Sequence, residues 1–331
     1  MIPSSKLLGR SPAAFELARA IVKAAPTDAS VLIVGESGTG KEVVARTVHS
    51  RSKRADAPFI AINCGAITPS LAESELFGHE KGAFTGAVSR SLGCFERAHT
   101  GTLFLDEVTE MPMSIQIQLL RVLETGTFHR VGGTELVKVD VRIIAATNRD
   151  LEQTVKGGRM RSDLLYRLAV FPIKVPPLRE RKTDIAYLAN RFLEQLAEQE
   201  GVKKTLTRAA ITHLQQYNWP GNIRELKNTI TRAYILAEGN EIHIPPMRPF
   251  FRDTMPIRQS DRLRIPVGTS IAAAERSLIL ATLDHYEGDK KRSALALGIS
   301  VKTLQNRLDQ IQSEPGATAS RTAPESATSS A

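Results

Sequence analysis

Apolar residues along the first half of the chain alternate between helical spacing and short continuous runs. After Ser11-Pro12, a pair typical of a helix start, apolar residues recur at helical spacing. Residues 29–34 form an apolar run that ends at a glycine and predict a buried strand, and residues 41–50 predict the next helix. Further buried strands are predicted over residues 58–63, 102–106 and 139–147. Strands that alternate with helices predict an α/β fold, with a parallel sheet covered by helices on both faces.

This pattern ends near residue 175, where Pro172, Pro176 and Pro177 interrupt it. The following residues predict a small lid that is entirely helical, with helices over residues 184–200, 208–217 and 222–238. Residues 245–267 are rich in Pro and Arg and lack periodicity, which indicates a linker. The predicted domains are an α/β subdomain (1–175), the helical lid (176–244), this linker, a helical domain (268–312) and a disordered tail rich in Ser, Ala and Thr (313–331).

Composition narrows the class of protein. The 331 residues are 42% hydrophobic and 24% charged, as in soluble globular proteins, and no apolar run approaches the length of a membrane span. Cys64 and Cys94 are the only cysteines, and their separation argues against a disulfide framework or a zinc site. The N-terminus lacks the apolar segment of a signal peptide. We therefore expect a cytoplasmic protein with no membrane partner.

The first candidate for chemistry is a loop that fits the phosphate-binding pattern G-x-x-x-x-G-K, Gly35-Glu36-Ser37-Gly38-Thr39-Gly40-Lys41. Glycines allow backbone N–H groups to turn toward phosphate oxygens, and Lys41 can reach the terminal phosphates. The pattern requires a strand before it and a helix after it, and both are predicted. Because two glycines and a lysine occur at this spacing by chance in some chains, a second motif is needed.

That second motif is an apolar strand that ends in two carboxylates, Leu103-Phe104-Leu105-Asp106-Glu107. At that position Asp106 can hold Mg²⁺ through water, and Glu107 can polarise the water that attacks the terminal phosphate. Alone, an acidic pair after a strand is equally typical of a solvated loop. Together with the glycine-rich loop it predicts an enzyme that binds a nucleoside triphosphate with Mg²⁺ and hydrolyses it to the diphosphate and phosphate; the family resemblance described below implies that this nucleotide is ATP.

A third segment lies between these two motifs, in an insertion over about residues 70–92: Gly82-Ala83-Phe84-Thr85-Gly86-Ala87. Its small residues make neither good core nor good helix, so we expect an exposed, flexible tip with one aromatic side chain. A glycine-rich hairpin turn is the alternative. In this place the hexapeptide resembles the sigma-54 activators, the bacterial enhancer-binding ATPases of the AAA+ group. The resemblance extends over about residues 7–312.

The resemblance assigns roles to further residues. It implies that Phe84 and Thr85 contact sigma-54, and that Asn63, otherwise a turn former at a strand end, restrains Glu107 until the nucleotide state is right. Thr147-Asn148 ends a predicted strand beside the loop and fits a first nucleotide sensor. The other assigned parts are two arginine fingers that act on the neighbouring subunit (Arg161 and Arg167), a second sensor in the lid (Arg224) and an accompanying loop (residues 128–133). Without the resemblance these arginines would be surface residues, partners of Asp163 or part of a helix start.

One position departs from the general phosphate-loop pattern. Glu42 follows Lys41 where a Ser or Thr usually binds Mg²⁺. The sigma-54 activators share this variant. The metal is therefore expected to rest mainly on Asp106 and on phosphate oxygens.

The last helical domain carries five basic residues with no acidic residue between them, which favours an anionic partner: Lys290, Lys291, Arg292, Lys302 and Arg307. Ser300 can cap a helix with one apolar face, formed by Val301, Leu304, Leu308 and Ile311. The opposite face offers Lys302, Thr303 and Asn306, with Arg307 at its flank.

A plain amphipathic hairpin is one interpretation of this domain. The segment also resembles the Fis-type helix-turn-helix that ends most sigma-54 activators. That resemblance implies a recognition helix in the DNA major groove, with Lys290, Lys291 and Arg292 as phosphate contacts.

The resemblance also implies the partners. These are double-stranded enhancer DNA, bound as a dimer, the sigma-54 RNA polymerase holoenzyme, and further copies of the chain in a hexameric or heptameric ring. Most relatives carry a receiver or ligand-sensing domain, for which we expect no room here unless the sequence is a fragment. Control by a separate regulator protein, a partner activator or expression level is then expected. A DNA-binding regulator that has lost activation, and an AAA+ chaperone or helicase, are the alternatives.

Overall fold

The structure is a computed structural model and describes residues 9–247, 268–286 and 288–313. The chain divides into two compact units, Met1–Arg248 and Pro249–Ala331. The predicted linker beyond residue 247 and the predicted tail beyond residue 313 lie outside the described residues.

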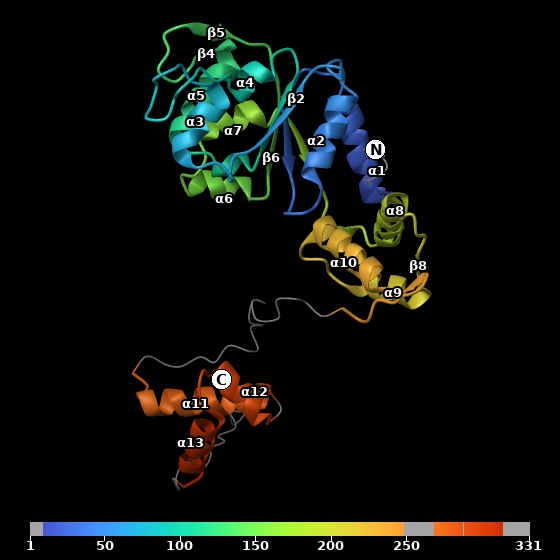
Figure 1. Ribbon diagram of the computed structural model, residues 1–331. Coiled ribbons are helices and arrows are strands. Elements are labelled where there is room, and N and C mark those ends of the chain that lie inside the picture. The colour runs from blue at the N-terminus through green and yellow to red at the C-terminus, as the bar shows by residue number, and fades with distance from the viewer. Residues whose placement is uncertain (1–8, 248–267, 287, 314–331) are drawn as a thin grey trace, which may run out of the picture. The chain divides into compact units, whose positions relative to one another are not determined.

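The larger unit is built around a five-stranded parallel sheet with the strand order β2-β3-β6-β1-β7 (Figure 1). Its strands are β1 (Val31–Val34), β2 (Phe59–Asn63), β3 (Thr102–Asp106), β6 (Arg142–Thr147) and β7 (Phe171–Lys174). The predicted α/β class is confirmed. Because all the strands run in one direction, the segments that follow β1, β2, β3 and β6 meet at the same edge of the sheet.

Different helices cover the two faces of the sheet (Figure 1). Val31 and Ile33 point to the face covered by α1 (Pro12–Ala24) and α2 (Lys41–Ser50), whereas Leu32 points to the other face. The helices on that other face are α3 (Pro69–Phe77), α4 (Cys94–Arg97), α5 (Met113–Thr125), α6 (Leu151–Lys156) and α7 (Ser162–Leu168). Burial on both faces explains why the central strands appear in the sequence as continuous apolar runs.

The edges of the sheet differ from the sequence prediction. β2 pairs only with β3, and its residues are half-buried or exposed rather than buried. The predicted break at Pro172 is wrong, because this residue lies within β7, an edge strand whose unpaired side needs no N–H. β6 begins at Arg142 rather than residue 139, because the preceding residues form an antiparallel hairpin of β4 (Thr127–His129) and β5 (Leu136–Lys138).

The lid follows β7 and has its own core around the fully buried Trp219. Its helices are α8 (Thr183–Glu200), α9 (Arg208–Gln216) and α10 (Asn222–Leu236), each within two residues of its predicted bounds. The lid is not entirely helical, because β8 (Thr205–Leu206) and β9 (Glu241–Ile242) pair in parallel.

A buried carboxylate connects the lid to the first helix. Asp184 of α8 accepts hydrogen bonds from the N–H groups of Arg10 (2.6 Å) and Ser11 (2.7 Å) and from the Ser11 hydroxyl (2.7 Å). The same hydroxyl accepts from the Ala14 N–H at 3.1 Å, so Ser11 caps α1 as its sequence predicts. The lid and the α/β subdomain are thus joined by hydrogen bonds between residues that lie 173 positions apart in the sequence.

The smaller unit contains α11 (Ile271–His285), α12 (Lys290–Ala296) and α13 (Val301–Ser313). Gly298 lies between α12 and α13 with φ 69°, a left-handed conformation that favours glycine. Ser300 accepts a hydrogen bond from the Thr303 N–H at 3.0 Å, which confirms the predicted cap of α13. Leu304 is fully buried, but Val301 is 44% exposed because it begins the helix at the end of the small core, so its predicted burial is wrong.

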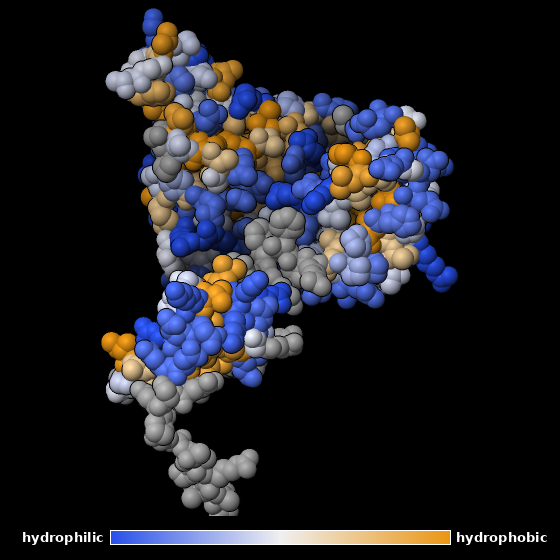
Figure 2. Space-filling model, turned by 60° about the horizontal axis from the view of Figure 1, so that its bottom comes forward, coloured by the Kyte–Doolittle hydropathy of each residue, from blue (hydrophilic) through white to orange (hydrophobic). Residues whose placement is uncertain are grey.

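The surface has no continuous apolar band on the face that Figure 2 shows; apolar residues form separate patches among hydrophilic ones. Within the described ranges, none of the helices combines the length and the apolar character needed to cross a membrane.

Candidate functional site

The predicted phosphate loop connects the carboxyl end of β1 to the first turn of α2. Gly38 and Gly40 have φ values of 76° and 95°, which glycine adopts without strain. The Thr39 hydroxyl donates to the Glu36 carbonyl at 2.7 Å. The loop is therefore folded at the N-terminus of a helix, where backbone N–H groups and the helix dipole favour an anion.

Lys41 is the first residue of α2 and is only 8% exposed. Its Nζ donates to the carbonyls of Gly35 (2.9 Å) and Glu36 (3.2 Å). Burial lowers the pKa of Lys41, and the charges of Asp106 and Glu107 oppose that shift. The ammonium group thus lies inside the loop and close to the carboxylates at the end of β3.

The acidic pair and Asn63 meet beside this loop. Glu107 has φ 53°, a left-handed conformation that is uncommon for residues other than glycine, and its N–H donates to Asp106 Oδ1 at 3.1 Å. Asn63 pairs with Asp106 in the register of β2 and β3. A Cβ added to Gly65 would lie 2.7 Å from the Glu107 carboxylate and 3.4 Å from the Asn63 side-chain oxygen. The Asn63 side-chain oxygen accepts from the N–H groups of Gly65 (2.9 Å) and Ala66 (3.1 Å), so Asn63 forms a turn at the end of β2, and the Glu107 carboxylate lies beside this turn.

The end of β6 completes this edge of the sheet. The Thr147 hydroxyl bonds to the Thr109 hydroxyl at 2.9 Å, and the Thr147 carbonyl accepts from the Gly35 N–H at 3.2 Å. Asn148 follows directly and is exposed. Because β6 lies between β3 and β1, Asn148 lies between the acidic pair and the phosphate loop along this edge.

The N-terminus of the lid helix α10 docks on the phosphate loop. The Gly38 carbonyl accepts from the N–H groups of Ile223 (2.9 Å) and Arg224 (3.3 Å). The Arg224 guanidinium donates to the Ser37 hydroxyl at 3.2 Å. The structure thus brings the predicted second sensor to the loop.

Two acidic side chains of this segment have partners of their own. The Glu42 carboxylate forms an exposed ion pair with Arg46 of the same helix at 2.7 Å. The Glu36 carboxylate accepts hydrogen bonds from Arg179 and Asn222, which the sequence did not indicate.

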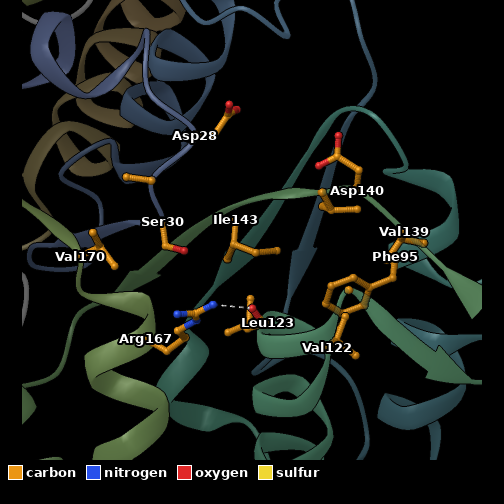
Figure 3. Close-up of a pocket in the computed structure, with 13 residues that line it drawn as sticks. Asp28, Ser30, Phe95, Val122, Leu123, Val139, Asp140, Ile143, Arg167 and Val170 are labelled. Atoms are coloured by element: carbon orange, nitrogen blue, oxygen red, sulfur yellow. Dashed lines mark hydrogen bonds between the residues drawn. The ribbon is translucent and has the colours of Figure 1, made fainter.

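The two predicted arginine fingers lie on α7 or at its start. Arg161 forms an ion pair with Asp163 at 2.7 Å. Arg167 donates to the Leu123 carbonyl at 3.0 Å and lines a cavity of about 360 Å³ (Figure 3). Ser30 lines the same cavity and directly precedes β1, so the cavity lies at the amino end of this strand. The phosphate loop lies at the other end, because it follows β1. Arg167 therefore lies at the edge of the sheet opposite to the phosphate loop of its own chain.

The Gly82–Ala87 segment forms an exposed turn. The Gly82 N–H donates to the Ala87 carbonyl at 2.9 Å, and Gly82 and Gly86 have φ values of 84° and 113°. Thr85 is exposed, and Phe84 is 40% exposed with its ring edge-on to His79 at a centroid distance of 5.0 Å. The segment therefore presents one aromatic ring and one hydroxyl to solvent.

A buried arginine joins this turn to the β4–β5 hairpin. The Arg130 side chain is 4% exposed and forms ion pairs with Glu96 (2.6 Å), Glu80 (3.0 Å) and Glu135 (2.9 Å). The Glu80 N–H also donates to the Val131 carbonyl at 3.0 Å. Since Glu80 lies two residues before Gly82, the hairpin and the turn are held against each other.

The basic residues of the smaller unit lie on its surface. Lys302, Thr303, Asn306 and Arg307 are exposed on α13, and Arg307 pairs with Glu275 at 3.1 Å. The N–H groups of Lys291 and Arg292 bond to the Asp289 side chain, which caps α12 and leaves both basic side chains exposed.

Comparison with protein families agrees with this arrangement. Residues 7–174 match the sigma-54 interaction domain, residues 179–262 match the AAA+ ATPase lid domain, and residues 270–310 match the Fis family of bacterial regulatory proteins. The chain belongs to the sigma-54 activator family. It therefore combines an ATP-binding AAA+ domain with a DNA-binding helix-turn-helix, in a family of transcriptional regulators.

Relatives cover nearly all of the chain. Regulatory protein AtoC of Escherichia coli (strain K12) is 46% identical over 316 residues, which are 93% of this chain and 68% of AtoC. Transcriptional regulatory protein FlbD of Caulobacter vibrioides is 46% identical, over 91% of this chain and 69% of FlbD. The crystal structure of NtrX from Brucella abortus has a TM-score of 0.68 and 38% identity, over 93% of this chain and 69% of that chain. NtrX structures in complex with ADP and with ATP each have a TM-score of 0.66.

Proposed function

We propose that this protein hydrolyses ATP and uses the energy to remodel the closed promoter complex of sigma-54 RNA polymerase. The observation that supports the proposal most strongly is that β3 connects the exposed turn to the nucleotide site. This strand follows the insertion that presents Phe84 and Thr85, and it ends at Asp106-Glu107 beside the phosphate loop. A change at the nucleotide thus has a short covalent and packed route to the exposed turn.

For the chemical step, Lys41 and the loop N–H groups hold the phosphates, and Glu107 polarises the attacking water. Asn63 holds Glu107 until nucleotide is in place, and Asn148 and Arg224 sense the terminal phosphate. Charge on the phosphates would be neutralised by Mg²⁺ when it is bound. The residues present fit such an ion, because the Asp106 carboxylate ends β3 beside the phosphate loop and would hold Mg²⁺ together with phosphate oxygens.

The active assembly is a ring of six or seven subunits. Arg161 and Arg167 reach the nucleotide of the neighbouring subunit, where a cation stabilises the charge that develops during phosphoryl transfer. The location of Arg167, at the sheet edge opposite to its own phosphate loop, supports action on a neighbour.

The smaller unit binds enhancer DNA and thereby places the ring near the promoters that it activates. As a dimer it places α13 in the major groove of an enhancer site, where Lys302, Thr303, Asn306 and Arg307 contact bases. Lys290, Lys291 and Arg292 contact phosphates. The exposure of these side chains supports this assignment.

Two assays test the function. Purified protein with Mg²⁺ and ATP should release phosphate, and it should be retained by immobilised sigma-54 when ADP, Mg²⁺ and aluminium fluoride mimic the transition state. A protein that neither releases phosphate nor binds sigma-54 under these conditions would overturn the proposal.

A further inference from the structure

Glu36 belongs to the phosphate loop, yet its carboxylate faces the lid. It accepts two hydrogen bonds from the Arg179 guanidinium, at 2.7 Å and 2.5 Å, and one from the Asn222 side-chain N–H group at 3.2 Å. The hydrogen bonds that Arg179 donates to Glu36 lower the pKa of Glu36 and raise the pKa of Arg179. A charged, two-pronged contact of this kind fixes both distance and direction.

Asn222 connects three segments through one side chain. Its oxygen accepts from the Leu178 N–H at 2.8 Å, and its nitrogen donates to the Ser37 carbonyl at 3.0 Å as well as to Glu36. It is fully buried and has φ 52°, a left-handed conformation that is uncommon for residues with a side chain. The surrounding hydrogen bonds hold this first residue of α10 in a conformation that it would otherwise rarely adopt.

The main chain of Glu36 faces the other way, toward the centre of the loop. Its carbonyl accepts from Lys41 Nζ at 3.2 Å and from the Thr39 hydroxyl at 2.7 Å. A bound phosphate that attracts Lys41 would weaken the hydrogen bond from Lys41 to the Glu36 carbonyl. It would therefore act on Glu36, the residue whose side chain contacts the lid. The contact on the lid side is tight, since a Cβ on Gly38 would lie 2.3 Å from the Gly221 carbonyl.

We propose that Glu36, Arg179 and Asn222 form a clamp that holds the N-terminus of α10 against the phosphate loop and so sets the rate at which nucleotide leaves the site. The proposal rests on nucleotide binding by residues 35–41, as proposed above. Arg179 and Asn222 are positioning residues, because their side chains contact the phosphate loop through Glu36 and Ser37 and act on the nucleotide through the placement of α10 and Arg224. The Arg179–Glu36 pair is 42% and 43% exposed, so its loss should speed release by a moderate factor of about three to ten.

The experiment measures release of a fluorescent N-methylanthraniloyl ADP from the full chain with Mg²⁺, chased by excess ADP. Arg179→Gln removes the charged contact. Asn222→Asp keeps the shape and the acceptor for the Leu178 N–H but sets a second carboxylate against Glu36. Both should release the analogue about three- to tenfold faster than wild type. Adding Glu36→Gln to Arg179→Gln should speed release no further than Arg179→Gln alone, because both changes remove the same contact.

The matched control is Glu194→Gln, which breaks an arginine–glutamate pair with Arg191 within α8 of the same lid. It should leave the release rate unchanged. Release rates of Arg179→Gln and Asn222→Asp equal to that of the control would overturn the clamp alone. If Arg179→Gln fails to fold, Asn222→Asp decides the matter, and a release rate equal to that of the control counts against the clamp. Failure of the wild-type protein to bind the analogue at all would overturn both this proposal and the proposed function.

Discussion

Replacement of Arg130 by Gln should destabilise the junction between the exposed turn and the β4–β5 hairpin. The guanidinium binds Glu96 through Nε (2.9 Å) and Nη2 (2.6 Å), and its Nη1 binds Glu80 and Glu135. Removing one partner of a buried ion pair costs about 3–5 kcal/mol. Glu96 is 12% exposed, whereas Glu80 and Glu135 are 32% and 70% exposed and can be hydrated, so we expect a cost about 1 kcal/mol lower than that range, about 2–4 kcal/mol.

A thermal unfolding scan measures the loss. For a unit of this size, each kcal/mol lowers the Tm by about 2–4 °C, so Arg130→Gln should melt about 4–16 °C below wild type. Hydrogen exchange over residues 79–87 should also become faster. The control is Arg19→Gln, whose pair with Glu16 is exposed on both sides and should contribute under about 1 kcal/mol. Adding Glu96→Gln to Arg130→Gln should recover part of the Tm. Unchanged Tm and unchanged exchange in Arg130→Gln would refute the reasoning.

Four further predictions concern the chemistry of the site and the DNA-binding unit. Glu107→Gln should bind ATP but hydrolyse it about 10²–10⁴-fold more slowly in a phosphate-release assay, and near-normal turnover would remove Glu107 from its role. Arg161→Ala should lower turnover by about 10³-fold or more while sparing DNA binding, and a strictly monomeric wild-type sample with full activity would contradict action in trans. Lys291→Ala should reduce the slope of log affinity against log salt for enhancer DNA by about one, and an unchanged slope would exclude a phosphate contact. Burial, with a smaller contribution from the charge of Asp106, raises the pKa of Cys64 to about 12. Iodoacetamide at pH 8 should therefore modify this thiol about 10³-fold more slowly in the folded protein than in urea. Equal rates of modification would contradict the burial of Cys64.

The local elements were predictable because local chemistry determines them. Gly40 and Lys41 set the start of α2, and the three lid helices follow apolar residues at helical spacing. The central strands were recognisable because burial on both faces leaves continuous apolar runs. Pro172 led to a wrong prediction, a break in the pattern where β7 in fact continues. Whether a proline interrupts a strand depends on which side of that strand is paired in the sheet, and the local sequence does not reveal this.

The contacts that join distant segments were not predictable. Arg130 lies 50 residues from Glu80 and 34 from Glu96, and no periodicity links these positions. Arg179 and Asn222 bind Glu36 across 143 and 186 residues. The sequence did contain one indication that Glu36 has a basic partner. An acidic residue inside a phosphate-binding loop is unfavourable near phosphates unless a cation neutralises it. That argument asks for a basic partner without indicating which of the 44 lysines and arginines supplies it.

The most direct test of the central proposal is the opening of a promoter that sigma-54 RNA polymerase serves, followed by permanganate reactivity of its unpaired thymines. With Mg²⁺ and ATP, the wild-type protein should open the DNA. Thr85→Ala should hydrolyse ATP at the wild-type rate and open none. Hydrolysis by the wild type without opening, or full opening by Thr85→Ala, would contradict the coupling of ATP hydrolysis to the exposed turn.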